Sequence, residues 1–204
     1  MLVVVAGIVA VFGHQLLASA SSSDAAPTNA LGSDRGGPGE LDGALRPRRE
    51  HRVLGEPDGA VPNGTTVWAT DVPGVANLAP ALLAALRRAA GDAANDGVVL
   101  FVDSGWRSPA YQEHLLHEAV SEYGSEQEAV RWVATPKTSA HVSGDAVDIG
   151  HSDATVWLSE HGAVYGLCQI YGNEPWHYEL RLEAVDRGCP PMYADPTHDP
   201  RMQQ

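Results

Sequence analysis

The sequence has few cysteines and few basic residues, and these two shortages exclude several classes of protein. Two cysteines in 204 residues are too few for a disulfide-stabilised scaffold or a cysteine-rich zinc module. Only 13 Lys and Arg oppose 26 Asp and Glu, which gives a formal net charge of −13. The chain therefore lacks the basic surface that binding to nucleic-acid phosphates or to anionic lipid requires, and we expect no nucleic-acid partner. Hydrophobic residues make up 44% of the sequence, which is enough for a packed core.

The N-terminal residues form a short apolar segment. Residues 2–12 read LVVVAGIVAVF, which is shorter than the roughly 20 residues of a membrane-spanning helix and typical of the apolar region of a signal peptide. The small residues Ala18, Ser19 and Ala20 fit a cleavage site, although no Lys or Arg precedes the apolar run. We expect residues 1–20 to be a signal peptide or an uncleaved N-terminal anchor, with a buried N-terminal helix as the alternative. The protein is then exported, and its only link to a membrane is the anchor.

Composition divides the rest of the chain into a linker, one domain and a tail. Residues 21–62 are rich in Gly, Pro, Ser and Ala and have no sustained period of 2 or 3.6, which predicts a flexible linker. Residues 63–190 contain the periodic apolar segments of a folded domain, and residues 191–204 are expected to be a C-terminal tail.

The apolar pattern of residues 63–190 predicts helices interspersed with short strands. Leucines at helical spacing from Leu78 predict a helix of about three turns that ends near Gly91. Further helices are expected at 109–123, at 125–134 with Trp132 facing inward, and at 152–161, and strands at 98–105, 145–151 and 176–180. Without regular βαβ units, this order indicates an α+β fold.

Two short segments combine imidazole and carboxylate groups. His141 and Asp148 are separated by a loop that Gly144 breaks and that leads into a strand, so both side chains can meet at one point. His177 supplies a second imidazole, and Glu174, which a proline follows, can lie beside a metal without binding it. Two histidines and one carboxylate suit zinc and leave a coordination position open, as in catalytic rather than structural sites.

These segments carry a family resemblance. Residues 139–148, SAHVSGDAVD, fit the pattern S-x-H-x-x-G-x-A-x-D, and residues 174–179, EPWHYE, fit its companion E-x-W-H. Together they resemble the zinc D-alanyl-D-alanine carboxypeptidases of the VanY type, which are related in fold to VanX dipeptidases and the Hedgehog signalling domain. The resemblance implies one α+β domain in which helices flank a small antiparallel sheet. It also implies zinc as the cofactor, with His141, Asp148 and His177 as its ligands and Glu174 as the general base.

The resemblance extends to residues that would face the substrate. Arg107 lies in SGWRS, with Gln112 shortly after it, and resembles the family arginine that faces the substrate carbonyl or terminal carboxylate. Ser139 matches the family serine placed near the ligands and the substrate. Between Asp148 and Glu174 the sequence departs from many relatives, because Gly-Asn stands where they have a Pro, so the pocket wall does not carry over.

The implied function is an exported, monomeric zinc peptidase that removes the terminal D-alanine of peptidoglycan stem peptides. Three alternatives stay open: a peptidoglycan endopeptidase, a D,D-dipeptidase, and a non-catalytic zinc-containing binding domain of the Hedgehog kind. The presence of both Glu174 and Arg107 weighs against the last of these.

The two cysteines fall close together at the C-terminal end of the domain. In an exported chain the pair Cys168 and Cys189 predicts a disulfide, with two free buried thiols as the alternative. Closing a loop of about 20 residues would contribute roughly 3 kcal/mol in the chain-entropy model.

Overall fold

The structure is a computed structural model, and it describes residues 53–203. The expected signal peptide or anchor (1–20) and the expected linker as far as residue 52 lie outside the described residues. Within 53–203, no helix combines the length and the apolar character needed to cross a bilayer.

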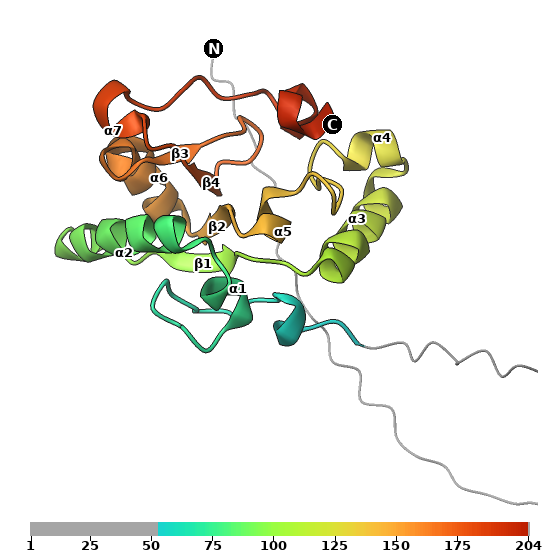
Figure 1. Ribbon diagram of the computed structural model, residues 1–204, viewed down its shortest axis with the longest axis horizontal. Helices are drawn as coiled ribbons and strands as arrows, with labels where there is room; N and C mark the ends of the chain where they lie inside the picture. Colours follow the sequence, from blue (N-terminus) through green and yellow to red (C-terminus); the bar gives the residue numbers. More distant parts are fainter. Residues whose placement is uncertain (1–52, 204) are drawn as a thin grey trace, which may run out of the picture. The chain divides into compact units, whose positions relative to one another are not determined.

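The centre of the fold is a four-stranded antiparallel sheet with the strand order β1-β2-β4-β3 (Figure 1). Its strands are short: β1 (Phe101–Ser104), β2 (Ala146–Gly150), β3 (Leu167–Gln169) and β4 (His177–Leu180). The sequence pattern predicted β1, β2 and β4 but missed β3, whose three residues are too few to show a period. The α+β class with a small antiparallel sheet is confirmed.

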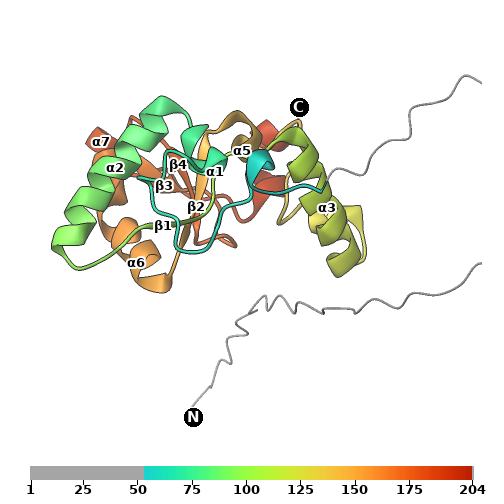
Figure 2. The same ribbon diagram turned by 90° about the horizontal axis from the view of Figure 1, so that it is seen from below.

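Two helices cover one face of this sheet, as Figure 2 shows for α2 (Pro80–Asn95) and α6 (Ser152–His161). Because side chains alternate along a strand, Val147 and Ile149 point to this face and enter the main core. The helix α2 continues past the expected end at Gly91, since Ala93, two residues further on, is also fully buried in that core. The opposite face of the sheet is left for polar side chains.

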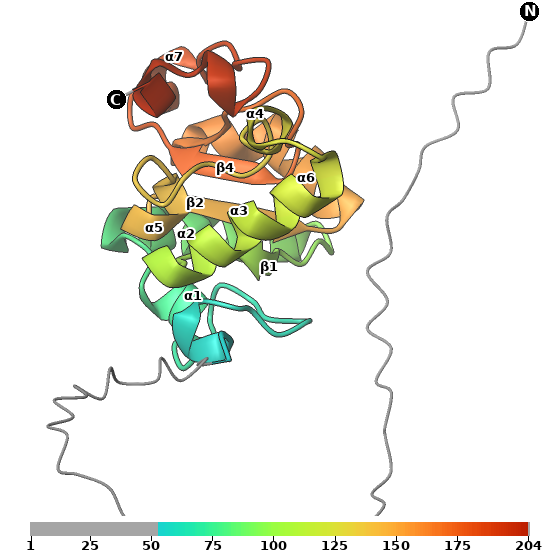
Figure 3. The same ribbon diagram turned by 90° about the vertical axis from the view of Figure 1, so that its right-hand side faces the viewer.

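A second group of helices lies at one end of the sheet, to the right of the strands in Figure 1 and towards the viewer in Figure 3. The expected helix over 109–123 is α3 (Pro109–Tyr123); Ser108 caps it by accepting a hydrogen bond from the Tyr111 backbone N–H at 3.1 Å. The expected helix over 125–134 is wrong beyond its first turn, because α4 spans only Glu126–Ala129. Trp132 is 39% exposed and stacks on Tyr123 instead of facing inward.

Short helices along the described chain complete the folded unit. They are the 3-10 helices η1 (Glu56–Asp58), η2 (Gly162–Tyr165), η3 (Pro196–His198) and η4 (Pro200–Gln203), and the one-turn helices α1 (Pro73–Ala76), α5 (Ala140–Ser143) and α7 (Ala184–Arg187).

Residues at both ends of the described chain pack on the domain. Asp58, within the expected linker, is buried, and its backbone carbonyl accepts a hydrogen bond from the Ser108 N–H at 2.8 Å. Asp195 and Asp199, within the expected tail, are buried as well. The folded unit thus extends beyond residues 63–190 in both directions.

The two cysteines form the predicted disulfide. The Sγ atoms of Cys168 on β3 and Cys189 are joined, and the bond closes a loop across 21 positions in sequence. It ties the start of the C-terminal segment to the edge strand of the sheet.

Candidate metal centre

His141 is held at the site by a short helix with a sharp end. Its Nδ1 lies 2.8 Å from the backbone carbonyl of Gly105, so this nitrogen donates and Nε2 is left free as a ligand. The helix α5 ends at Gly144, whose φ of +79° is the left-handed conformation that favours glycine. A Cβ there would also lie 2.5 Å from the Asn77 carbonyl oxygen. This explains why the motif has glycine three residues after the histidine.

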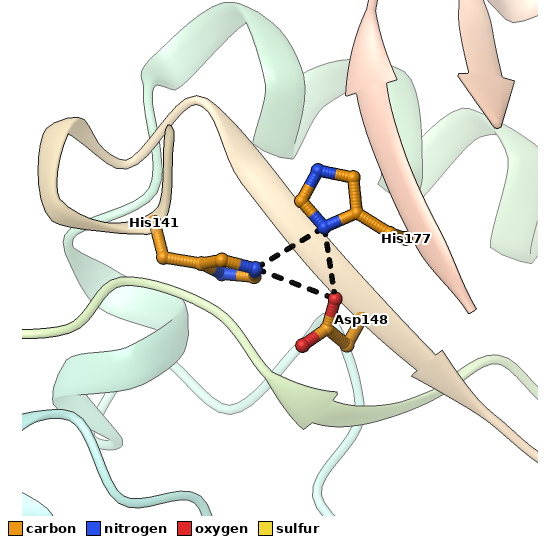
Figure 4. Close-up of side chains that lie close together, drawn as sticks. All are labelled: His141, Asp148 and His177. Atoms are coloured by element: carbon orange, nitrogen blue, oxygen red, sulfur yellow. Dashed lines mark hydrogen bonds and ion pairs between the residues drawn. The ribbon is translucent and has the colours of Figure 1, made fainter. Parts of the chain in front are cut away.

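Asp148 and His177 are brought together by strand pairing. They are register partners on β2 and β4, and their side chains point to the sheet face opposite the core. Asp148 Oδ1 lies 3.2 Å from His177 Nδ1 and 3.4 Å from His141 Nε2, and the two histidine nitrogens are 3.3 Å apart (Figure 4). All three side chains are buried.

This arrangement of donor atoms suits a tetrahedral metal ion. Ligand atoms at about 2.0–2.1 Å from a tetrahedral zinc lie roughly 3.3–3.4 Å from one another, which matches the observed spacing. The three residues form a group that could hold a metal ion, and they are the three predicted ligands. Two imidazoles and one carboxylate leave a fourth position for water or substrate.

The charges at the centre are strongly coupled. Burial lowers the pKa of His141, and Arg107 lowers it further. Burial alone would lower the pKa of His177, but its hydrogen bonds to Asp148 and Glu179 raise it to about 9. Burial would raise the pKa of Asp148, yet the two histidines and Arg107 hold it well below the ordinary value. The metal-free site therefore keeps a proton on His177 opposite an ionised Asp148, and a metal must displace that proton.

Glu174 lies beside the three residues. Its Oε2 is 3.6 Å from His177 Nδ1, whereas its Oε1 is buried and has no hydrogen-bond partner among the described residues. Burial raises the pKa of Glu174 to about 7; nearby His177 opposes this rise and Asp148 adds to it. A carboxylate with a free oxygen and a pKa near neutrality can both accept and return a proton.

The residues predicted to contact the substrate lie near the three proposed ligands, but Arg107 and Gln112 are hydrogen-bonded to other residues of the protein. The Arg107 guanidinium contacts Asp148 Oδ2 at 2.8 Å through Nη2 and Ser104 Oγ at 2.8 Å through Nε. Gln112 is buried; it accepts from Arg107 Nη1 at 3.2 Å and donates to the Ala134 carbonyl at 2.8 Å. The bond to Ala134 fixes the Gln112 amide, whose oxygen then holds Arg107 in place. The predicted contact of Gln112 with the substrate stays a prediction.

Ser139 is buried directly before α5, two residues from His141. This position agrees with a place near the ligands. A role toward the substrate stays a prediction.

The structure adds a group on the far side of His177. Glu179 Oε1 lies 3.3 Å from His177 Nε2, and its carboxylate also contacts Arg181 and Arg201. The sequence indicates the contact with His177, because residues two apart on a strand share a face and Glu179 is two residues after His177. The contact with Arg201 crosses 22 positions to an irregular segment, which no local pattern reveals.

A buried His-Asp-His group beside a free carboxylate is the arrangement of a metal-dependent hydrolase. The model of the VanY family, D-alanyl-D-alanine carboxypeptidase, matches residues 76–181. The chain belongs to this family.

Individual relatives agree with this assignment. A D-alanyl-D-alanine carboxypeptidase of Enterococcus faecalis (strain ATCC 700802 / V583) is 37% identical over 118 residues, which cover 45% of this chain and 44% of the relative. The chain thus spans less than half of that protein's length.

Solved structures are similar as well. A point mutant of the vancomycin resistance D,D-pentapeptidase VanY from a VanB-type resistance cassette, in complex with Zn(II), is 30% identical, with a TM-score of 0.48 over 50% of this chain and 72% of that one. The LD-carboxypeptidase LdcB is 24% identical, with a TM-score of 0.50 over 62% of this chain and 70% of that one. The likeness to LdcB concerns the fold.

Proposed function

We propose that this protein is an exported zinc carboxypeptidase that hydrolyses the terminal D-alanyl-D-alanine bond of peptidoglycan stem peptides. The observation that carries the proposal is the buried Oε1 of Glu174, which has no hydrogen-bond partner within residues 53–203 and lies next to the His141–Asp148–His177 group. Membership of the VanY family supports the choice of reaction and substrate. His141, Asp148 and His177 are the proposed zinc ligands.

Zinc, when bound, supplies a Lewis acid that polarises the scissile carbonyl and lowers the pKa of a water molecule. Glu174 takes the proton from the attacking water and returns it to the leaving amine of D-alanine. Its buried position raises its pKa to about 7, near the value at which one group can perform both transfers. Glu174 can do this only if it does not bind the metal. Its Oε2 lies 3.6 Å from His177 Nδ1, whereas the three proposed ligand atoms lie 3.2–3.4 Å from one another.

Arg107 is the proposed positive group for the substrate. Its guanidinium is part-buried and fixed by Asp148, Ser104 and Gln112, so it presents charge at the site without having to be ordered on binding. Such a group can face a terminal carboxylate or a developing oxyanion. Ser139 would line the same part of the site.

The cellular placement is proposed on the sequence and the substrate. A peptidoglycan peptidase acts in the cell envelope, and residues 1–20 have the composition of a signal peptide or anchor. The disulfide between Cys168 and Cys189 agrees with an oxidising compartment. We propose residues 21 to about 52 as the linker to a catalytic domain that acts as a monomer.

The test uses the purified protein loaded with zinc and a stem pentapeptide that ends in D-alanyl-D-alanine. Mass spectrometry and D-alanine release should show loss of one D-alanine, and a chelator should abolish the reaction. His141→Ala and Asp148→Ala should each lose zinc and activity together. Release of an intact dipeptide would favour the dipeptidase, cleavage of cross-linked muropeptides the endopeptidase, and full zinc occupancy without any hydrolysis the non-catalytic domain.

A further inference from the structure

The residue that orients His177 is itself held by charged groups. If His177 binds the metal through Nδ1, its Nε2 carries the hydrogen and donates it to Glu179 Oε1, 3.3 Å away. Glu179 is 1% exposed, so its carboxylate needs compensating donors. Arg181, two residues along the same chain segment, contacts only Oε2, at 2.7 Å. This contact alone does not fix the plane of the carboxylate, and so it does not fix the position of Oε1, the oxygen that faces the histidine.

The direction of that oxygen is set by a distant arginine. Arg201 Nη1 donates to Glu179 Oε2 at 2.7 Å and Nη2 donates to Oε1 at 3.1 Å. A bidentate guanidinium fixes the plane of a carboxylate as well as its charge. Arg201 lies in η4, beyond residues 76–181 that the family model matches. The C-terminal segment thus adds a contact to the metal centre that the matched region does not contain.

Several contacts keep the C-terminal segment, residues 189–203, in this position. Asp199 is fully buried and accepts from Arg201 Nε at 2.9 Å. Asp199 also accepts from the hydroxyl of Tyr171 at 3.1 Å, and the Tyr171 ring lies 5.0 Å from the ring of His177. Two routes therefore lead from this segment to the same histidine. In Figure 1 the segment runs from α7 across the top of the domain towards α4.

The segment is anchored at its start and near its middle. The disulfide of Cys189 joins its first residue to Cys168, the register partner of Glu179 in the sheet. Near the middle, buried Asp195 contacts Arg131 Nε at 3.1 Å. Anchoring of this kind lets the segment keep Arg201 in a fixed place.

We propose that the C-terminal segment is a positioning element of the metal centre and that Arg201 orients His177 through Glu179. The inference rests on the proposed metal site, with His177 as a ligand, but not on the identity of the peptide substrate. Among the described residues, Arg201 contacts Glu179 and Asp199 and none of the three proposed ligands. Its effect is on zinc affinity.

The test is zinc binding by full-length protein, measured by competition with a chelating indicator, together with thermal unfolding of the metal-free form. Arg201→Gln should weaken zinc binding about tenfold, within the range found for partners of metal ligands. Arg201→Lys keeps the charge but not the bidentate contact and should lie between wild type and Arg201→Gln. Arg187→Gln is the matched control, because Arg187 is exposed and makes no side-chain hydrogen bond or ion pair within residues 53–203. It should bind zinc as wild type does.

A double-mutant cycle tests the route through Glu179. Glu179→Gln should weaken zinc binding by itself, and Arg201→Gln added to it should weaken binding little further. Unchanged zinc affinity in Arg201→Gln, with only a lower melting temperature, would overturn the inference and leave Arg201 a structural residue. Should Arg201→Gln fail to fold, the same comparison is made with Arg201→Lys, which must then bind zinc more weakly than wild type. If wild-type protein binds no zinc, the proposed function fails first, and the inference fails with it.

Discussion

Two glutamates lie beside His177, and their surroundings shift their pKa values in opposite directions. Glu174 precedes β4; it has one buried oxygen without a partner among the described residues, and burial raises its pKa to about 7. Glu179 lies on β4, and burial would raise its pKa too, but His177 and Arg201 hold that pKa far below the ordinary value. Glu174 can therefore gain and lose a proton near neutral pH, whereas Glu179 stays ionised.

Because burial acts on both glutamates in the same sense, the difference between their pKa values comes from their partners. Both carboxylates are shielded from solvent, and desolvation favours the neutral form of each. Two guanidiniums compensate this cost at Glu179, whereas no arginine forms an ion pair with Glu174 in the part of the chain that the structure describes. A group that must gain and lose a proton needs a pKa near the working pH, and two guanidiniums would lower that pKa too far.

The largest expected effect comes from removing the free carboxylate. Glu174→Gln keeps the size of the side chain but cannot accept a proton, so kcat should fall by about 10²–10⁴. Zinc occupancy should stay at the wild-type level, because Glu174 is not a proposed ligand. Both quantities are measured on one preparation, by D-alanine release and by metal analysis.

Glu179→Gln is the matched comparison for this experiment, since it changes the other carboxylate in the same way. It should weaken zinc binding while activity at saturating zinc falls far less than in Glu174→Gln. Loss of zinc in Glu174→Gln would make Glu174 a ligand, and undiminished hydrolysis would remove it from the mechanism.

The sequence predicts the surroundings of Glu174 much better than those of Glu179. His141, Asp148, His177 and Glu174 lie in two contiguous motifs, whose spacing follows from a glycine turn and from strand alternation. Such local geometry can be inferred without a structure. The partners of Glu179 cannot, because Arg201 reaches it from a segment of 3-10 turns with no period. For the same reason residues 191–204 have the sequence pattern of a tail.

The next effect in size concerns the covalent link on the Glu179 side. Replacing Cys168 and Cys189 together by Ala should lower the free energy of unfolding by about 3 kcal/mol in the chain-entropy model. Because the disulfide anchors the segment that carries Arg201, zinc binding should weaken as well. Urea unfolding and indicator competition measure the two effects. A drop in stability with unchanged zinc affinity would mean that the other contacts suffice to keep Arg201 in place.

Reckoned per pH unit, the smallest effect is the pH dependence of the metal-free protein, in which Glu174 and His177 have separate pH windows. The folded-state pKa of Glu174, about 7, lies above its unfolded value of 4.5, so its contribution to stability is present below pH 4.5 and is lost as pH rises through 7. The pKa of His177, about 9, lies above 6.5, so its contribution is present below pH 6.5 and is lost as pH rises through 9, by at most about 1.4 kcal/mol per pH unit. The folded-state pKa of Glu179 lies below its unfolded value of 4.5. Its contribution to stability is therefore present above pH 4.5 and is lost as pH falls below that value.

Melting temperatures of metal-free protein should therefore fall as pH rises from 6.5 to 9. Below pH 6.5 the lowered pKa of His141 acts in the opposite sense and offsets the decline due to Glu174. Glu174→Gln should remove the contribution of Glu174 up to pH 7 and leave the decline above it, because the glutamine does not titrate. Glu179→Gln should reduce the decline between pH 7 and 9, because it removes one of the two hydrogen bonds that keep the proton on His177. Saturating zinc should oppose the decline, since the metal replaces that proton and binds more tightly as pH rises. Equal curves for both variants would show that the two glutamates do not differ in the way their surroundings indicate.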